Sequence, residues 1–250
     1  MNFFSLIKRN FLYKFKKKIN IDQDHVKQES LDNLFSQYNT DKANFINNGK
    51  DKGHGYAKFY ETHLSKFKDD NIKILEIGSF AGASAAAFAK FFPKAQIYCL
   101  DINLSNFKYS SKRIHPYGVN SSDKKMMTKL LLKIDFFNSI KNFDVIIDDG
   151  SHKLSDQLKA LDFFFKYVGS EGFYIIEDYK FPNYFNHLND INELKINELI
   201  DKIKNNKVIK SELLSQDTIY EIIANNKEIF EYKGNTESSD IVFFEKKIIS

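Results

Sequence analysis

The chain has 250 residues, 42% of them hydrophobic and 28% charged, which is typical of a folded globular protein long enough to bury a sizeable core. Its single cysteine excludes a disulfide framework or a cysteine-based zinc site within the chain, so carboxylates and histidines are left as metal ligands. The net charge is +4, but residues 1–20 hold six cations and no acid. The rest of the chain therefore has a net charge of about −2, which argues against a basic surface that binds nucleic acid.

The first twenty residues interleave aromatic and aliphatic side chains with lysine and arginine. This pattern predicts a helix whose apolar face lies on an anionic membrane surface, or docks on the body of the protein or on another subunit. We expect residues 1–50 to form a basic N-terminal helical extension and residues 51–250 to form the main domain. No apolar run reaches transmembrane length and no signal-peptide pattern is present, so we expect a cytoplasmic protein, at the inner membrane face if the helix binds lipid. Phenylalanine-rich termini favour a homo-oligomer.

Short apolar runs that alternate with helical segments begin at residue 72. Such alternation indicates a parallel sheet with helices on both faces. We therefore expect an α/β fold, Rossmann-like and doubly wound, with a mostly parallel seven-stranded sheet, an antiparallel C-terminal strand and an N-terminal helical segment. Strands are expected at 72–77, 96–100, 114–119, 143–148, 172–177, 229–232 and 241–245, and helices at 29–37, 56–64, 83–92, 123–132, 154–167 and 188–203.

A glycine turn follows the first of these strands and opens a helix, in the sequence Glu76-Ile77-Gly78-Ser79-Phe80-Ala81-Gly82. Its glycines let the backbone approach a ligand, and the helix start offers free amides. Asp101 ends the next strand, where a carboxylate can accept hydrogen bonds from a ribose diol. The turn fits a nicotinamide dinucleotide or S-adenosylmethionine. Because Glu76 would repel a pyrophosphate and suits a cationic ligand, S-adenosylmethionine is the predicted cofactor.

Two predicted strands end in paired acids, Asp148-Asp149 and Glu177-Asp178. If these strands are neighbours, Asp149, Glu177 and Asp178 converge, and their mutual repulsion calls for a divalent cation. Ligation by oxygen favours Mg²⁺, with Mn²⁺ or Fe²⁺ as alternatives. Since adjacent strand residues point to opposite faces, Asp148 is assigned a structural or cofactor-side role. For the same reason, Glu177 and Asp178 both reach the metal only if the loop just past the strand turns.

Residues 40–180 resemble the class I S-adenosylmethionine-dependent methyltransferases. Within that class they are similar to the metal-dependent sugar O-methyltransferases of mycinamicin and macrocin type and to the cephalosporin hydroxylase-like group. The resemblance rests on Thr40-Asp41-Lys42, His54-Gly55-Tyr56, the turn at 76–82, Asp101, the run Asp148-Asp149-Gly150-Ser151-His152, and Glu177-Asp178.

The resemblance implies roles for individual residues. Asp149, Glu177 and Asp178 would bind magnesium, and His152 would be the general base. Glu76 and Asp101 would hold the cofactor beside the turn residues Gly78, Ser79 and Gly82, with Ser122 or Asp123 near the adenine and His54 and Tyr56 in an N-terminal lid.

Taken together, these residues predict an enzyme that methylates a sugar hydroxyl with S-adenosylmethionine and a divalent cation. The acceptor is expected to be a nucleotide-linked sugar or a surface-glycan precursor, in polysaccharide biosynthesis. The cation would lower the pKa of the hydroxyl, and His152 would accept its proton. Two alternatives stay open. One is an iron-dependent hydroxylase-like enzyme, although such sites usually take two histidines and a carboxylate. The other is a non-catalytic binding protein on the same fold.

Overall fold

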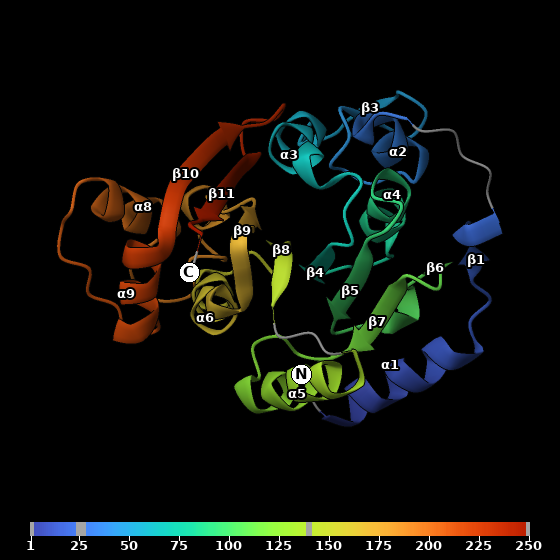
Figure 1. Cartoon of the computed structure of the whole chain (residues 1–250), viewed down its shortest axis with the longest axis horizontal. Helices are drawn as coiled ribbons and strands as arrows, with labels where there is room; N and C mark the ends of the chain where they lie inside the picture. The colour runs from blue at the N-terminus through green and yellow to red at the C-terminus, as the bar shows by residue number, and fades with distance from the viewer. Residues whose placement is uncertain (1–2, 24–28, 139–141, 249–250) are drawn as a thin grey trace. The chain divides into compact units, whose positions relative to one another are not determined.

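The computed structural model describes residues 3–23, 29–138 and 142–248 (Figure 1). The chain divides into two compact units. The first comprises residues 1–121 with 234–237, and the second comprises residues 122–233 with 238–250. The boundary predicted at residue 50 stays a prediction, and residues 1–2 and 24–28 of the predicted extension lie outside the described residues.

The first unit contains three parallel strands of the main sheet, β4 (Lys73–Ile77), β5 (Gln96–Asp101) and β7 (Ile114–Gly118). The helix α4 (Ala83–Phe91) connects β4 to β5, and its small side chains are almost all buried. Pro116 lies within β7, which ends the strand order of the sheet. A proline is tolerated there because an edge strand has one side without ladder hydrogen bonds.

Shorter elements complete the first unit. The α2 helix begins after Ser30, whose hydroxyl accepts a hydrogen bond from the backbone N–H of Asn33, a typical N-cap. Two small ladders pair β1 with β6 in parallel and β2 with β3 in antiparallel orientation. These elements are α1 (Phe3–Phe15), α2 (Leu31–Gln37), α3 (Ala57–Leu64), β1 (Ile19–Asn20), β2 (Phe45–Ile46), β3 (Asp51–Lys52), β6 (Tyr109–Ser110), and the 3₁₀ turns Ile21–Gln23, Ser65–Phe67 and Leu104–Asn106.

The second unit contains the other four strands of the main sheet. In it, β8 (Phe143–Asp148) runs parallel to β9 (Val168–Glu177), and β11 (Asp240–Lys246) runs antiparallel to β9. The strand β10 (Asn226–Lys233) pairs with β11 as an antiparallel hairpin. Its helices are α5 (Lys124–Asn138), α6 (Leu154–Phe164), α7 (Phe181–Tyr184), α8 (Ile196–Lys204) and α9 (Gln216–Asn225), with a 3₁₀ turn at Phe165–Tyr167.

The predicted fold class is confirmed: seven strands make up a mostly parallel sheet, and the C-terminal strand is antiparallel. The side chains of β4, β5, β8 and the stretch 172–177 of β9 are almost all buried, and this burial explains the apolar runs in the sequence. Four helical segments differ from expectation. The helix expected at 188–203 begins only at Ile196, and the helix expected at 123–132 continues to Asn138. In addition, α9 was not expected, and α7 forms within the predicted aromatic loop.

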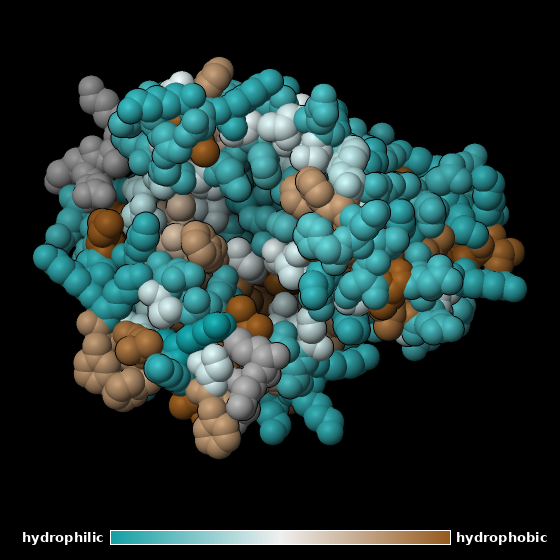
Figure 2. Space-filling view, turned by 180° about the vertical axis from the view of Figure 1, so that it is seen from behind, coloured by the Kyte–Doolittle hydropathy of each residue, from teal (hydrophilic) through white to brown (hydrophobic). Residues whose placement is uncertain are grey.

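The surface is mostly hydrophilic on the face seen in Figure 2, where apolar side chains gather at the lower left, over α1. Among the described residues, no helix combines the length and the apolar character needed to cross a membrane.

Candidate functional site

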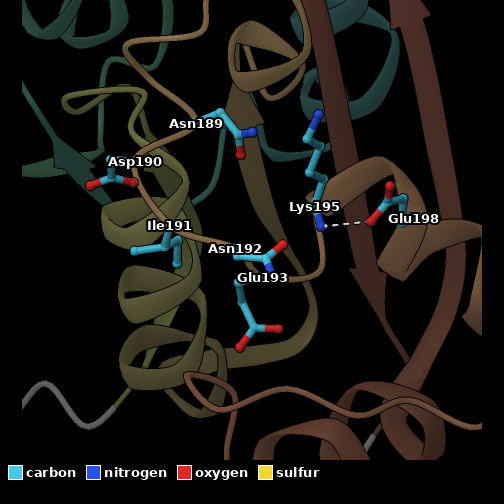
Figure 3. A pocket seen from close by; sticks show the side chains of 7 residues that line it. All are labelled: Asn189, Asp190, Ile191, Asn192, Glu193, Lys195 and Glu198. Atoms are coloured by element: carbon cyan, nitrogen blue, oxygen red, sulfur yellow. Dashed lines mark hydrogen bonds between the residues drawn. The ribbon is translucent and has the colours of Figure 1, made fainter.

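An open pocket of about 520 Å³ lies in the second unit between the end of α7 and the start of α8 (Figure 3). Its carboxylates already accept hydrogen bonds: Asp190 from Ser155, and Glu193 from the backbone N–H groups of Leu194 and Glu212. These bonds fasten the loop before α8, so the pocket is explained by loop structure. Its lining residues are Asn189, Asp190, Ile191, Asn192, Glu193, Lys195 and Glu198.

The predicted acids lie at the carboxyl end of β8, also in the second unit. Asp148 is the last strand residue and is buried, and the backbone N–H of Gly150 donates to its Oδ1 at 3.3 Å. Asp149 follows, and the chain then turns through His152, whose φ is +56°. Because a left-handed residue reverses the local chain direction, this turn brings His152 back toward Asp149. Their Nε2 and Oδ1 atoms are 3.7 Å apart.

A second turn follows β9. Glu177 is the last residue of this strand, and Asp178, the first residue after it, has a φ of +51°. The carbonyl oxygen of Asp178 accepts a hydrogen bond from the backbone N–H of Phe181, which starts α7. Two adjacent residues of a regular strand would point to opposite faces. The left-handed conformation of Asp178 ends that alternation just past the strand.

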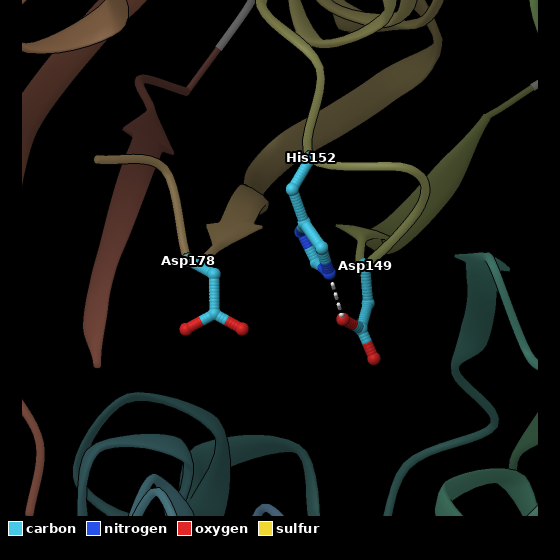
Figure 4. A group of neighbouring side chains, drawn as sticks. All are labelled: Asp149, His152 and Asp178. Carbon is cyan, nitrogen blue, oxygen red and sulfur yellow. Dashed lines mark ion pairs between the residues drawn. The ribbon is translucent and has the colours of Figure 1, made fainter. Parts of the chain in front are cut away.

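Three side chains come together at these two turns: Asp149, His152 and Asp178 (Figure 4). Each offers one ligand atom, and these atoms all lie within 4.8 Å of one another. Asp178 is buried, while the other two are partly exposed. We call this group the carboxylate–histidine cluster. Glu177, also a predicted ligand, is buried at the end of β9 and is not a member of the cluster.

The donor set of the cluster fits a divalent cation. Two carboxylates in a small and partly buried space repel each other, and a cation between them would offset both that repulsion and the loss of hydration. Carboxylate oxygens suit Mg²⁺, and an added imidazole nitrogen also suits Mn²⁺ or Fe²⁺.

Asp148 differs from the cluster residues in its surroundings. Burial raises the pKa of its carboxyl to about 8, helped by the charges of Asp149 and Asp156 and opposed by the hydrogen bond from Gly150. Among the described residues its Oδ2 atom has no hydrogen-bond partner, and neither does the buried hydroxyl of Tyr174 on the adjacent strand. A neutral carboxyl at this position would not add a third negative charge next to the cluster, and the structural or cofactor-side role of Asp148 stays a prediction.

Asp156 organises the turn that carries His152, and its role was not predicted from the sequence. It lies in the first turn of α6 and accepts hydrogen bonds from the hydroxyls of Ser151 and Ser122, both at 2.6 Å. Ser122 is therefore held by α6, while Asp123 caps α5 by accepting from the backbone N–H of Met126. The sequence does show Asp156 as an acid in the first turn of the predicted helix, where a carboxylate is favoured and can accept hydrogen bonds from the preceding turn.

Gln157 was not predicted either. It is 2% exposed, and neither atom of its amide has a hydrogen-bond partner among the described residues. Its position on the apolar face of α6, between Leu154 and Leu161, was visible in the sequence. A polar residue on such a face is the signal for a buried polar site.

Aromatic side chains line one side of the cluster. The rings of His152 and Phe181 lie 5.0 Å apart, and Phe181 contacts Phe185 at 5.1 Å. Phe185 is 38% exposed, so this row of rings runs from the cluster to the surface. The predicted aromatic loop thus borders the acids of the second unit.

The glycine turn lies in the first unit. Glu76 is completely buried and accepts a hydrogen bond from the hydroxyl of Ser84, and the Ser79 hydroxyl donates to the carbonyl of Glu76 at 3.3 Å. Asp101 accepts from the backbone N–H of Phe80 at 2.7 Å through Oδ2. Asp101 therefore shapes the turn, and its oxygens keep further lone pairs for a ligand.

The two glycines of the turn have positive φ values, +86° at Gly78 and +74° at Gly82. A Cβ at Gly82 would lie 2.5 Å from the ring of Phe107, so this glycine makes room for a side chain of the protein itself. Phe80 also has a positive φ, +41°, and its side chain is 65% exposed. An exposed aromatic residue in a strained backbone conformation is a feature found at ligand sites.

The predicted lid residues are tied into the first unit. Tyr56 is completely buried, its backbone N–H donates to the carbonyl of Lys42, and its ring meets that of His54 at 5.2 Å. The carbonyl of His54 accepts from the backbone N–H of Asn235. The roles predicted for these and the other cofactor-side residues stay predictions.

No family model matches the chain. Over 159 residues the chain is 27% identical to mycinamicin VI 2''-O-methyltransferase of Micromonospora griseorubida. The aligned region covers 61% of this chain and 36% of that protein. Over 155 residues it is 28% identical to L-olivosyl-oleandolide 3-O-methyltransferase of Streptomyces antibioticus. That aligned region covers 59% of this chain and 36% of the relative. The chain thus spans little more than a third of the length of these relatives.

A solved structure of the MycE methyltransferase from the mycinamycin biosynthetic pathway, in complex with Mg and SAH, is similar with a TM-score of 0.66. The match covers 89% of this chain and 55% of that chain at 22% identity. A second MycE structure, which also contains mycinamycin VI, matches with a TM-score of 0.64. At this identity the likeness shows the fold.

Proposed function

Because this chain is a relative of macrolide-sugar O-methyltransferases and has the fold of the class I methyltransferases, we propose that it methylates a sugar hydroxyl with S-adenosylmethionine and a divalent cation. The observation that carries the proposal is the carboxylate–histidine cluster, where three potential metal ligands lie within 4.8 Å of one another. A structural role alone would not require two acids to face each other there.

Asp149 and Asp178 would hold the cation, with Glu177 as the further predicted ligand. When bound, the cation would lower the pKa of the acceptor hydroxyl and fix its position. His152 would take the proton from that hydroxyl as the oxygen attacks the methyl carbon. The carbon–sulfur bond breaks as the carbon–oxygen bond forms, and the products are a methyl ether and S-adenosylhomocysteine.

The cofactor would be held in the first unit, with the carboxylate of Glu76 facing its cationic end and Asp101 accepting from the ribose. A sugar acceptor is supported by Phe181 and Phe185, since aromatic rings can pack against the apolar face of a sugar ring. We propose a nucleotide-linked sugar or surface-glycan precursor as the acceptor, handled inside the cell.

The test uses the purified chain with S-adenosylmethionine, MgCl₂ and a panel of nucleotide sugars and glycosides. We expect a product heavier by one methyl group, detected by mass spectrometry, and no product after chelation of the metal. Calorimetry should show binding of S-adenosylmethionine in preference to NAD. If neither cofactor binds, the proposal is wrong, and turnover that survives a chelator would overturn the metal requirement.

A further inference from the structure

One side of the N-terminal helix α1, which carries Asn10 and Tyr13, contacts the rest of the first unit. The side chains of Asn10 and Lys16 donate hydrogen bonds to the carbonyls of Gly118 and Ser105, at 2.9 and 2.7 Å. Tyr13 meets the ring of Phe107 edge-on at 6.1 Å. A Cβ added to Gly118 would lie only 1.5 Å from Oδ1 of Asn10, so the Asn10 side chain packs directly on the backbone of Gly118.

The other side of α1 carries exposed apolar side chains. Leu6, on the attached side, is 5% exposed, whereas the side chains of the opposite face are 49–76% exposed. Their spacing of three and four residues places them in one stripe along the helix. The stripe consists of Phe4, Ile7, Phe11 and Phe15. Figure 2 shows apolar side chains gathered over α1. A helix that served only to cover the body would show the reverse orientation.

Basic side chains surround the stripe. Lys8 and Lys14 flank it on the helix and are exposed, and Lys17 follows the helix, also exposed. No acid occurs before Asp22. Two copies of this surface placed face to face would bring like charges together, so the charge pattern argues against a second copy as the occupant. An apolar stripe on a segment whose charged residues are all cations matches a lipid surface with anionic headgroups.

We propose that α1 binds the surface of an anionic membrane, with the stripe inserted among the lipid chains and the lysines against the headgroups. The helix would lie in the plane of the membrane, because its 13 residues are too few to cross the bilayer. The hydrogen bonds of Asn10 and Lys16 would keep the first unit attached to the bound helix. This proposal adds an interaction surface and does not depend on methyl transfer.

The test is co-sedimentation of the full chain with vesicles of phosphatidylcholine, with and without phosphatidylglycerol. We expect binding to the phosphatidylglycerol vesicles only, and at least tenfold weaker binding when NaCl rises from 50 to 500 mM. The double variant Phe4→Glu/Phe15→Glu should lose at least tenfold in affinity for the same vesicles. These two side chains are 76% and 75% exposed, so the change should leave the fold intact.

The matched control is the double variant Val208→Glu/Tyr220→Glu, which adds the same charge at side chains 74% and 73% exposed outside α1. It should bind the vesicles like the unaltered chain, and circular dichroism should show all three proteins folded. The proposal is overturned if the unaltered chain does not bind anionic vesicles at 50 mM NaCl, or if both double variants lose equal affinity. Light scattering that reveals a dimer dissolved by Phe4→Glu/Phe15→Glu, without vesicle binding, would instead identify a second copy as the occupant.

Discussion

At the scale of single residues, Asp149 and Asp178 offer the sharpest test of the metal site. Each variant, Asp149→Asn and Asp178→Asn, removes a charge while keeping the side-chain shape. We expect Mg²⁺-dependent turnover to fall at least about 100-fold, because the hydroxyl would lose its activating cation. Binding of Mn²⁺, followed by electron paramagnetic resonance, should weaken in parallel. The exposed Asp70→Asn should change neither quantity, and full turnover in Asp149→Asn would refute metal catalysis.

The role of His152 as a general base can be distinguished from that of a metal ligand by comparing the effects of its substitution on kcat and on Mn²⁺ affinity. In His152→Gln we expect kcat to fall by roughly 10² to 10⁴, the usual contribution of a general base. The affinity for S-adenosylmethionine, measured by calorimetry, should stay the same. A large loss of Mn²⁺ affinity with a small loss of kcat would instead make His152 a ligand.

The residues of the cluster were only partly predictable. Paired acids at the ends of buried strands are visible in the sequence, and they predict Asp149, Glu177 and Asp178 as metal ligands. Which of two adjacent acids turns toward a neighbour depends on one backbone angle, the φ of +51° at Asp178, and no residue type dictates it. The grouping of Asp149, His152 and Asp178 without Glu177 therefore required the structure.

At the scale of elements, Asp162 fastens α6 to α9. It accepts a hydrogen bond from the backbone N–H of Ser215, the N-cap of α9, at 2.8 Å. Burial alone would raise the pKa of Asp162, but the hydrogen bonds with Ser215 and Thr218 and the nearby Lys124 outweigh it and lower that pKa. The contribution of Asp162 to stability is thus present above about pH 4, the ordinary pKa of an aspartate, and is lost as the pH falls through its lowered pKa.

We therefore expect Asp162→Ala to reduce the free energy of unfolding by about 2 kcal/mol at pH 7. The difference from the unaltered chain should shrink toward pH 2. Urea denaturation at several pH values measures this dependence, with the exposed Asp217→Ala, in the first turn of α9, as the control. An equal loss at pH 7 and pH 2 would show that packing, and not charge, is responsible.

The elements that sequence patterns predicted best are the buried strands, since short apolar runs between turn residues are typical of strands covered on both faces. The helical spacing of Leu188 and Ile191 predicts a helix that begins at residue 188, eight residues before the observed start at Ile196. In the structure the loop before Ile196 is instead held by Asp190 and Glu193, through hydrogen bonds to residues distant in the chain. Likewise, α9 depends on Asp162 for its start, a contact that no local pattern reveals.

At the scale of the whole molecule, cation binding should raise stability. A ligand that binds only the folded state adds RT ln(1 + [L]/Kd), about 2.7 kcal/mol at 100 times Kd. We expect MgCl₂ to raise the melting temperature measured by calorimetry, and EDTA to reverse the change. The variants Asp149→Asn and Asp178→Asn should melt at the same temperature with and without Mg²⁺. A shift that persists in both variants would mean that the cation binds elsewhere.

For the whole molecule, the sequence predicts both the fold class and the family that the chain resembles, because the strand–helix alternation and the acid-rich strand ends occur in a recognisable order. The resemblance to sugar O-methyltransferases is confirmed by the curated relatives. The acceptor was not predictable, since the residues that would contact it, such as Phe181 and Phe185, follow no pattern shared with those motifs.

Left-handed backbone occurs at His152, Asp178 and Phe80, three non-glycine residues of the two proposed binding regions. That conformation costs roughly 1–2 kcal/mol for most residues and almost nothing for glycine. A library of variants sorted only for heat resistance should therefore accumulate glycine at these positions. Since glycine would fit these backbone conformations better, a role in binding or catalysis would explain why a histidine, an aspartate and a phenylalanine occur there.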